Sequence, residues 1–151
     1  MPSAREYAGA AAAGGKIYVI GGYDGQKALA VNEAYYPQRD GDGEEPWEEK
    51  APLPEGRYGM GVTSLADNVF VVGGVSEGQE DSTIPYEWIT QDSQWAQFDR
   101  PSYPMGNFLA LISFDDSIYG LGGKETASSS SLARVQSYQA FYTISVPIII
   151  K

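Results

Sequence analysis

A short apolar segment that ends in a pair of glycines occurs three times in this chain of 151 residues, and it limits the possible folds more than any other feature. The three copies span residues 16–22, 68–74 and 117–123. Their glycine pairs follow one another after 52 and then 49 residues. Segments that recur at such an interval indicate an array of similar units, each too small to bury a core alone.

Other features keep the same phase. Trp47 and Trp95 lie 48 residues apart, and the Met-Pro-Ser-Ala-Arg segment at 1–5 is matched by Leu-Pro-Glu-Gly-Arg at 53–57. We therefore expect one domain composed of three repeats. Their approximate boundaries are 1–52, 53–103 and 104–151.

Each repeat is predicted to contain four strands, because short β-branched and aromatic runs alternate with Gly, Asp and Pro clusters. Tight turns at 14–15, 66–67 and 115–116 are typical of β-hairpins. No segment keeps a period of 3.6, so we expect almost no helix. The predicted strands are 7–13, 16–22, 29–36, 47–51, 58–66, 68–74, 84–90, 94–98, 107–114, 117–123, 133–140 and a run within 142–150. The fold class is therefore all-β, with three four-stranded antiparallel sheets.

These residues resemble the kelch repeat, in which an arginine leads the inner strand, a second strand ends in Gly-Gly, a third reads Glu-x-Tyr, and a tryptophan follows. The first repeat fits this pattern with Arg5, Gly21, Gly22, Glu33, Tyr35 and Trp47. The second fits it with Arg57, Gly73, Gly74, Glu87 and Trp95, and has Ile89 at the tyrosine position. The third keeps Gly122, Gly123 and Tyr138, but has Gly106 for the arginine, Gln136 for the glutamate and no tryptophan.

The resemblance implies β-propeller blades that pack around an axis. Propellers close with about four to eight blades. Three repeats therefore correspond to a partial propeller, or to half of a six-bladed ring that a second copy completes. We expect Trp47 and Trp95 to fill the space between blades. The glycine pairs should adopt positive φ and leave room for a neighbouring aromatic ring. Arg5 and Arg57 should bond to neighbouring blades, with an anion contact as the alternative.

Composition argues against several classes of function. Ten Lys and Arg against twenty Asp and Glu give a net charge of −10, which disfavours nucleic acid and anionic membranes as partners. The chain has no cysteine and no histidine, so it has neither a thiol nucleophile nor a serine–histidine triad. We expect no metal and no cofactor. Residues 40–45 lack the spacing of a calcium loop and should form a solvated loop. No signal peptide or membrane span is predicted, and the compartment is left open.

The favoured function is a non-enzymatic scaffold that binds a protein partner through loops on one face. If strands alternate in direction, the loops between second and third strands share a face with the connections between repeats. Tyrosines near strand ends, Tyr7 among them, suit such a surface because they combine apolar area with a hydroxyl. The candidate partner-binding residues are Tyr23, Asp24, Arg57, Tyr58 and Tyr103.

An enzyme or a lectin-like protein is the alternative, acting on or binding a sugar or another small molecule through Asp, Glu, Tyr and Arg at the channel mouth. Two carboxylates close together, one with a raised pKa, would favour the enzyme, and a shallow mouth lined by Tyr and Gly would favour binding. Self-association is also expected, because blades 1 and 3 would each leave an apolar face uncovered.

Overall fold

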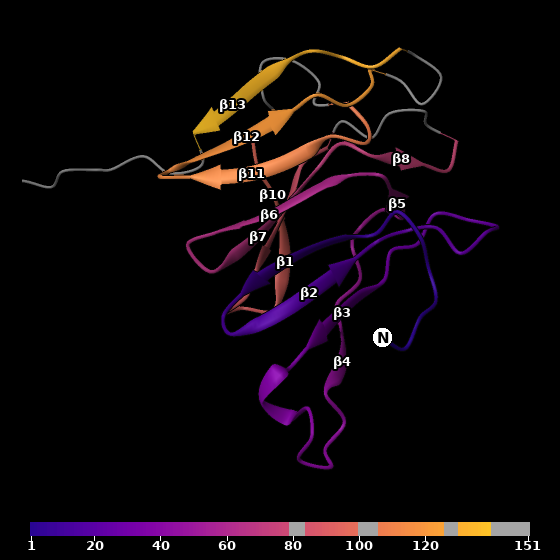
Figure 1. Ribbon diagram of the computed structural model, residues 1–151, viewed down its shortest axis with the longest axis vertical. Helices are drawn as coiled ribbons and strands as arrows, with labels where there is room; N and C mark the ends of the chain where they lie inside the picture. Colours follow the sequence, from indigo (N-terminus) through magenta and orange to yellow (C-terminus); the bar gives the residue numbers. More distant parts are fainter. Residues whose placement is uncertain (79–83, 100–105, 126–129, 140–151) are drawn as a thin grey trace, which may run out of the picture.

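The computed structural model describes residues 1–78, 84–99, 106–125 and 130–139, and their strands form three antiparallel sheets (Figure 1). The first sheet contains β1 (Gly9–Ala13), β2 (Lys16–Ile20), β3 (Asn32–Tyr35) and β4 (Trp47–Lys50). The second contains β6 (Gly61–Leu65), β7 (Asn68–Val72), β9 (Tyr86–Ile89) and β10 (Gln94–Gln97). The third contains β11 (Ala110–Phe114), β12 (Ser117–Leu121) and β13 (Val135–Gln139), and β5 (Arg57–Tyr58) pairs separately with β8 (Val75–Ser76).

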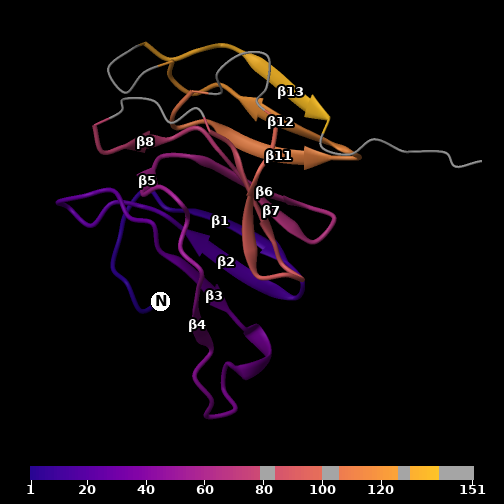
Figure 2. The same ribbon diagram turned by 180° about the vertical axis from the view of Figure 1, so that it is seen from behind.

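The three sheets are blades of a partial propeller, named here blade 1, blade 2 and blade 3 in chain order. The first strands of the blades are neighbours, because β6 lies between β1 and β11. The other strands of each blade follow outward (Figures 1 and 2). The predicted all-β propeller fold is therefore confirmed. The twelfth predicted strand, within 142–150, lies outside the described residues. A single turn of 3-10 helix, Pro37–Arg39, is the helical element of the described part.

Hairpin turns connect the first two strands of each blade, as predicted. Gly14 and Gly15 have φ of 54° and 71°, and Ala66 and Asp67 have φ of 48° and 62°. Two successive residues with positive φ form the type of turn whose twist matches that of the flanking strands. In the first two blades, the local sequence therefore determines the start of the sheet.

Two apolar clusters hold the blades together by removing side chains from water. The larger one lies between blades 1 and 2, and its members include Tyr18, Ile20, Ala34, Val69, Val71, Tyr86 and Trp88. The smaller one lies between blades 2 and 3, where Val72 and Leu109 contact Phe98, Leu111 and Tyr138.

The first glycine pair shows why glycine is needed where the second strand ends. Gly21 and Gly22 have φ of 61° and 111°. A Cβ on Gly21 would lie 2.5 Å from the Arg57 carbonyl oxygen and 2.3 Å from the Met60 methyl carbon. The Gly22 N–H donates to that same carbonyl at 2.9 Å. Positive φ is confirmed, but the expected aromatic neighbour is wrong: the main chain of the second repeat and Met60 occupy the space.

The strand register corrects the alignment of the second repeat. In blade 1, Glu33 is paired with Val19. The equivalent of Val19 in blade 2 is Val71, which is paired with Tyr86. Tyr86 therefore stands at the glutamate position, and the assignment of Glu87 to it is wrong by one residue.

The same shift places Trp88, and not Ile89, at the position of Tyr35, because Ile17 pairs with Tyr35 and Val69 with Trp88. A shift of one residue moves a side chain to the opposite face of its sheet. Trp88 accordingly lies in the core between blades, with 1% of its surface exposed.

Candidate partner-binding site

The loops of the blades separate onto two sides of the molecule. The hairpin turns β1–β2, β6–β7 and β11–β12 lie at the left of Figure 1, and the loops that follow β2 and β7 lie at the right together with β5 and β8. Figure 2 shows the same separation from behind. The right-hand side is named the loop face.

Four aromatic rings meet on the loop face. Tyr23 and Tyr58 have ring centroids 5.2 Å apart, and Tyr7 and Phe108 have centroids 5.8 Å apart. The centroids of the Tyr7 and Tyr58 rings are 6.2 Å apart, so the two pairs are in contact with each other. Tyr7 is 55% exposed and Phe108 is 40% exposed. These four residues, named the aromatic cluster, come from all three repeats and offer both apolar area and phenol hydroxyls to a ligand.

An unusual backbone conformation positions two of the rings. Tyr7, Gly59 and Phe108 occupy the same place in the three repeats, two residues before the first core strand, and have φ of 55°, 63° and 55°. Their main chains are connected in series, because Gly59 N–H donates to Tyr7 O at 2.9 Å and Phe108 N–H donates to Gly59 O at 2.6 Å. A Cβ on Gly59 would lie 2.7 Å from the Phe108 ring. The glycine therefore makes room for this ring.

Tyr23 and Asp24 begin the loop that follows β2. Tyr23 exchanges two backbone hydrogen bonds with Glu6, at 2.8 and 2.9 Å. The Asp24 Oδ1 atom accepts from the N–H groups of Gln26 and Lys27, both at 2.8 Å. These bonds, that of Lys27 foremost, lower the pKa of Asp24 and keep the carboxylate ionised. An open depression lies beside Tyr23, and it is lined by Ala4, Arg5, Glu6, Tyr23, Asp24 and Gly25.

Arg57 lies in the interior, because none of its surface is exposed. Its guanidinium donates to Glu55 at 2.8 Å and to the carbonyls of Gly73 and Ile84 at 3.2 and 2.9 Å. It also lies 5.0 Å from the centre of the Tyr86 ring. Burial lowers the pKa of Arg57, and the neighbouring Glu55 opposes this shift. Arg57 is therefore not available on the loop face.

Arg5 occupies the equivalent place in blade 1 and has a different set of partners. Its Nη2 atom contacts Glu33 Oε2 at 2.8 Å, and both side chains are almost fully buried. The Ser3 hydroxyl donates to the other carboxylate oxygen of Glu33 at 2.6 Å. The side-chain bonds of Arg5 and Arg57 stay within their own repeats, so the expected side-chain bonds to neighbouring blades are wrong. The main chain of Arg57 does reach blade 1, because its carbonyl accepts from the Gly22 N–H at 2.9 Å and its N–H donates to the Leu29 carbonyl at 3.1 Å.

The two tryptophans singled out from the sequence have different surroundings. The Trp95 ring packs against the Trp88 ring with their centroids 5.2 Å apart, and its Nε1–H donates to the Ala51 carbonyl at 2.9 Å, so it connects blades 2 and 1. Trp47 is half-buried and packs on Tyr35 at 5.0 Å, on the face of blade 1 that points away from blade 2. An inter-blade role for Trp47 stays a prediction. Tyr103 lies outside the described residues.

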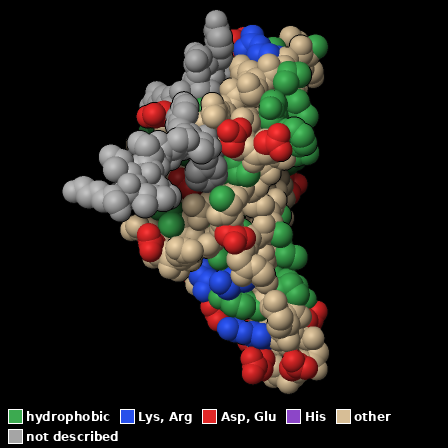
Figure 3. All heavy atoms as spheres, turned by 90° about the vertical axis from the view of Figure 1, so that its left-hand side faces the viewer, with side chains coloured by type: hydrophobic (Ala, Val, Ile, Leu, Met, Phe, Trp, Pro, Cys, Tyr) green, Lys and Arg blue, Asp and Glu red, His purple; other side chains and the backbone are tan. Residues whose placement is uncertain are grey.

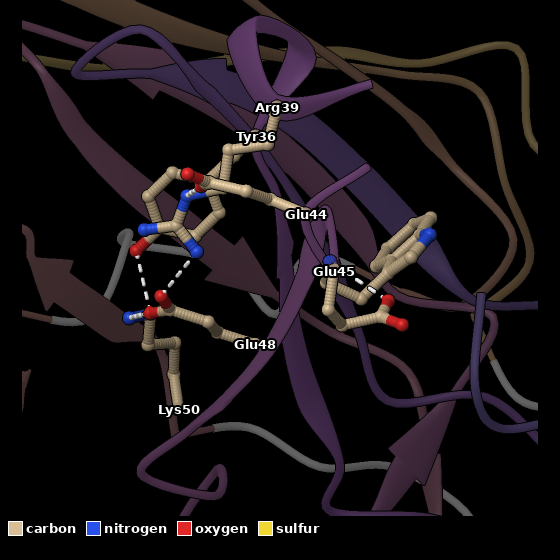
Figure 4. A network of polar contacts seen from close by, with 7 residues as sticks. Tyr36, Arg39, Glu44, Glu45, Glu48 and Lys50 are labelled. Carbon is tan, nitrogen blue, oxygen red and sulfur yellow. Dashed lines mark hydrogen bonds and ion pairs between the residues drawn. The ribbon is translucent and has the colours of Figure 1, made fainter. Parts of the chain in front are cut away.

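A group of charges at the outer edge of blade 1 was not predicted from the sequence (Figure 4). Glu48 accepts from Arg39 at 2.6 Å, from Lys50 at 2.5 Å and from the Tyr36 hydroxyl at 2.8 Å. These three bonds, with that of Lys50 the largest contribution, lower the pKa of Glu48 to about 2. The Arg39 guanidinium also lies 4.0 Å above the Tyr36 ring. Blue side chains near the lower end of Figure 3 mark the same end of the molecule.

The loop at 40–45 extends from this edge and is exposed throughout, as expected. Among the described residues, no group of three or more Asp and Glu side chains is placed to hold a metal ion. No helix in the described ranges has the length and apolar character needed to cross a membrane.

Comparison with known proteins agrees with this architecture. The family profile described as the Kelch motif matches residues 4–40. Beta-scruin of Limulus polyphemus is 28% identical over 145 residues, which are 91% of this chain and 15% of that protein. Kelch-like protein 35 of Mus musculus is 28% identical over 109 residues, 72% of this chain and 18% of that protein. Kelch-like protein 40 of Mus musculus is 30% identical over 119 residues, 76% of this chain and 18% of that protein.

The three repeats, the strand topology and these matches define a class of protein, the β-propellers built from short sequence repeats. Within that class, the chain belongs to the kelch-repeat family. It spans less than a fifth of the length of each of these three relatives.

Proposed function

We propose that the chain is a non-enzymatic interaction module that binds a protein partner through the aromatic cluster on its loop face. The observation that carries this proposal is the exposure of the cluster, whose rings come from all three repeats. Tyrosine and phenylalanine are enriched at protein interfaces, and a contiguous exposed apolar patch commonly marks an interaction site. Loops held by a rigid scaffold are also the usual place for binding residues.

Two observations favour binding over catalysis on a sugar or another small molecule. The depression beside Tyr23 is open, whereas small-molecule sites usually enclose most of their ligand. The Asp24 carboxylate has a lowered pKa, and a general acid requires the opposite shift.

The proposal is tested by selecting binders from a random peptide library displayed on phage. The variant Tyr7→Gly/Phe108→Gly removes two exposed rings at positions where positive φ already suits glycine, so the fold should persist. The control Phe114→Ser removes an aromatic ring that is 65% exposed on blade 3, outside the cluster. Selected peptides should bind the wild type and the control, and bind the double variant about tenfold more weakly. Equal binding to all three proteins would overturn the proposal.

Self-association is the second part of the proposal, in which a second copy covers the open faces of blades 1 and 3. Leu121 and Val135 on the outer face of blade 3 are 39% and 70% exposed. Burial of such side chains would favour association, and the charge of −10 on each chain would oppose it at low salt.

Light scattering at increasing salt tests this second part. We expect the average mass to rise with salt, and the variant Val135→Glu to remain a monomer. A single monomeric species at every salt concentration, with no binding of a hydrophobic dye, would contradict it.

A further inference from the structure

We propose that the aromatic cluster recognises a cationic segment of its partner, one that carries exposed arginine. The inference rests on the proposed binding function and specifies the chemistry of the ligand. Exposed aromatic faces lie beside exposed Asp and Glu side chains on the loop face, and a guanidinium is the group that can contact both at once.

The first argument is the position of the carboxylates. Glu6 and Tyr23 face each other in an antiparallel bridge, so their side chains leave the backbone on the same side. Asp24 follows Tyr23, and its hydrogen bonds to backbone N–H groups keep it ionised. Glu6 and Asp24 are both exposed, and both line the depression beside the Tyr23 ring.

The second argument concerns the positive charges close to this surface. Arg5 also lines the depression, but its side chain is buried and its charge is compensated by Glu33 at 2.8 Å. Lys27 is exposed at the end of the same turn as Asp24. Lys124 belongs to blade 3 and lies over the Phe108 ring. Because the depression itself presents Glu6 and Asp24, it should attract a cation, in agreement with the charge of −10 on the whole chain.

The third argument compares the aromatic rings that have a Lys or Arg side chain over them with those that do not. The Lys124 Nζ atom lies 6.0 Å from the centre of the Phe108 ring, within the aromatic cluster itself. Elsewhere, Tyr36 and Tyr86 hold arginine guanidinium groups at 4.0 and 5.0 Å. No such cation lies over Tyr7, Tyr23 or Tyr58 among the described residues. A partner's arginine would supply the missing contact.

The fourth argument is the unfavourable backbone conformation of the two residues whose rings are exposed. Tyr7 and Phe108 have φ of 55°, a region that bulky residues rarely occupy, and Gly59 shows that glycine is compatible with the same place. Backbone strain of this kind concentrates at functional sites. The exposed rings therefore have a use other than stabilising the fold.

The test measures binding of dye-labelled peptides by fluorescence anisotropy. The probe has five Gly-Arg units, and the matched peptides replace arginine by lysine, by uncharged citrulline or by glutamate. We expect the arginine peptide to bind best, the lysine peptide to bind about threefold more weakly, and the citrulline and glutamate peptides to bind at least about tenfold more weakly. Binding should also weaken as salt is added.

Variants separate a specific site from general attraction to an acidic protein. Glu6→Gln and Tyr7→Gly/Phe108→Gly should each weaken the arginine peptide by about threefold or more. Asp42→Asn removes an exposed carboxylate from the 40–45 loop, and Phe114→Ser removes a ring outside the cluster. Neither control should change binding. Equal binding of the arginine and citrulline peptides, or equal loss in Asp42→Asn, would overturn the inference.

The peptide-library selection distinguishes this inference from the proposed function. Selected peptides that need the aromatic cluster but carry no arginine would leave the binding function standing and refute the cationic ligand. Selected peptides that do not discriminate against Tyr7→Gly/Phe108→Gly would refute both. Arginine enriched among cluster-dependent peptides is the expected result.

Discussion

Blades 1 and 3 present the same kind of face toward the blade that would follow them, and only blade 1 has that face covered. In blade 1 the paired residues Ile20 and Asn32 are completely buried, because blade 2 packs over them. The equivalent pair in blade 3 is Leu121 and Val135, which are 39% and 70% exposed. The difference shows that a neighbouring blade, and not the strand sequence alone, determines whether a blade face is buried.

The opposite faces give the same result. Ile17 of blade 1 is 38% exposed, whereas Val69 and Ile118 at the same place in blades 2 and 3 are 0% and 1% exposed. Blade 2 is thus covered on both sides, and each of the other two blades is covered on one side. Stability should therefore be concentrated where blade 2 contacts its neighbours.

The largest expected effect tests whether the stability of the chain comes mainly from the contacts of blade 2 with its neighbours. Trp88→Ala should destabilise the chain by about 3–5 kcal/mol, because it opens a cavity between two blades. Tyr35→Ala, at the same place on the open face of blade 1, should cost about 1–2 kcal/mol. Urea denaturation of both variants checks the comparison. Equal losses would mean that the open face of blade 1 is covered in solution.

The second prediction compares the carboxylates that serve the two buried arginines. Glu33→Gln should cost about 2–3 kcal/mol, because Arg5 and Glu33 are both buried and the charge of Arg5 would lose its counter-ion. Glu55→Gln should cost about 1 kcal/mol or less, because Glu55 is partly exposed and Arg57 keeps two carbonyl partners. Urea denaturation again supplies both values, with the exposed Glu49→Gln as control. A larger loss for Glu55→Gln would contradict this account.

The two tryptophans provide a smaller and sharper comparison. Trp95→Phe removes the hydrogen bond from Nε1 to the Ala51 carbonyl and should cost about 1 kcal/mol. Trp47→Phe should change stability by less than about 0.5 kcal/mol at low protein concentration. Thermal unfolding at two protein concentrations checks both values. A cost for Trp47→Phe that grows with concentration would show that a second copy covers this residue.

The smallest effect concerns acid. Glu48 has a pKa of about 2 in the folded chain against an ordinary 4.5, so the bonds that it accepts stabilise the fold above about pH 4.5. This contribution is lost as the pH falls from 4.5 toward 2. Glu48→Gln should therefore flatten the acid dependence of the melting temperature in that interval. An unchanged pH profile would mean that Glu48 has no such bonds in solution.

The strand topology could be predicted because its determinants are local. The glycine pairs and hairpin turns require particular backbone angles, and these residues lie beside the strands that they limit. The register of β9 could not be predicted in the same way. Glu87 matches the motif by type, but the buried alternation runs through Tyr86 and Trp88. The alternation of large apolar residues at Tyr86 and Trp88 is the sequence feature from which the register of β9 could have been predicted.

The candidate site was predicted in part. Tyr23 and Tyr58 lie in the aromatic cluster, and their places next to predicted loops were sufficient to select them. Phe108 was not selected, because nothing in an aromatic residue indicates a positive φ. Phe108 aligns with Gly59, a residue type that favours positive φ. Only the structure shows that the Phe108 ring occupies the space left by this glycine. Burial of Arg57 depends on contacts with Ile84, just before the third strand, and with Tyr86 at its start, which sequence spacing does not give.

The partners of the buried arginines have a consequence for how the number of repeats in a chain of this kind can change. Arg5 finds its carboxylate at Glu33 and Arg57 finds its own at Glu55, each within the same repeat. The third repeat has neither charge, since Gly106 and Gln136 stand at the two places and line a small cavity. Each of the two buried arginines thus has its counter-ion inside its own repeat. A segment of about fifty residues could be duplicated, deleted or exchanged without leaving an unpaired buried charge in the blades on either side.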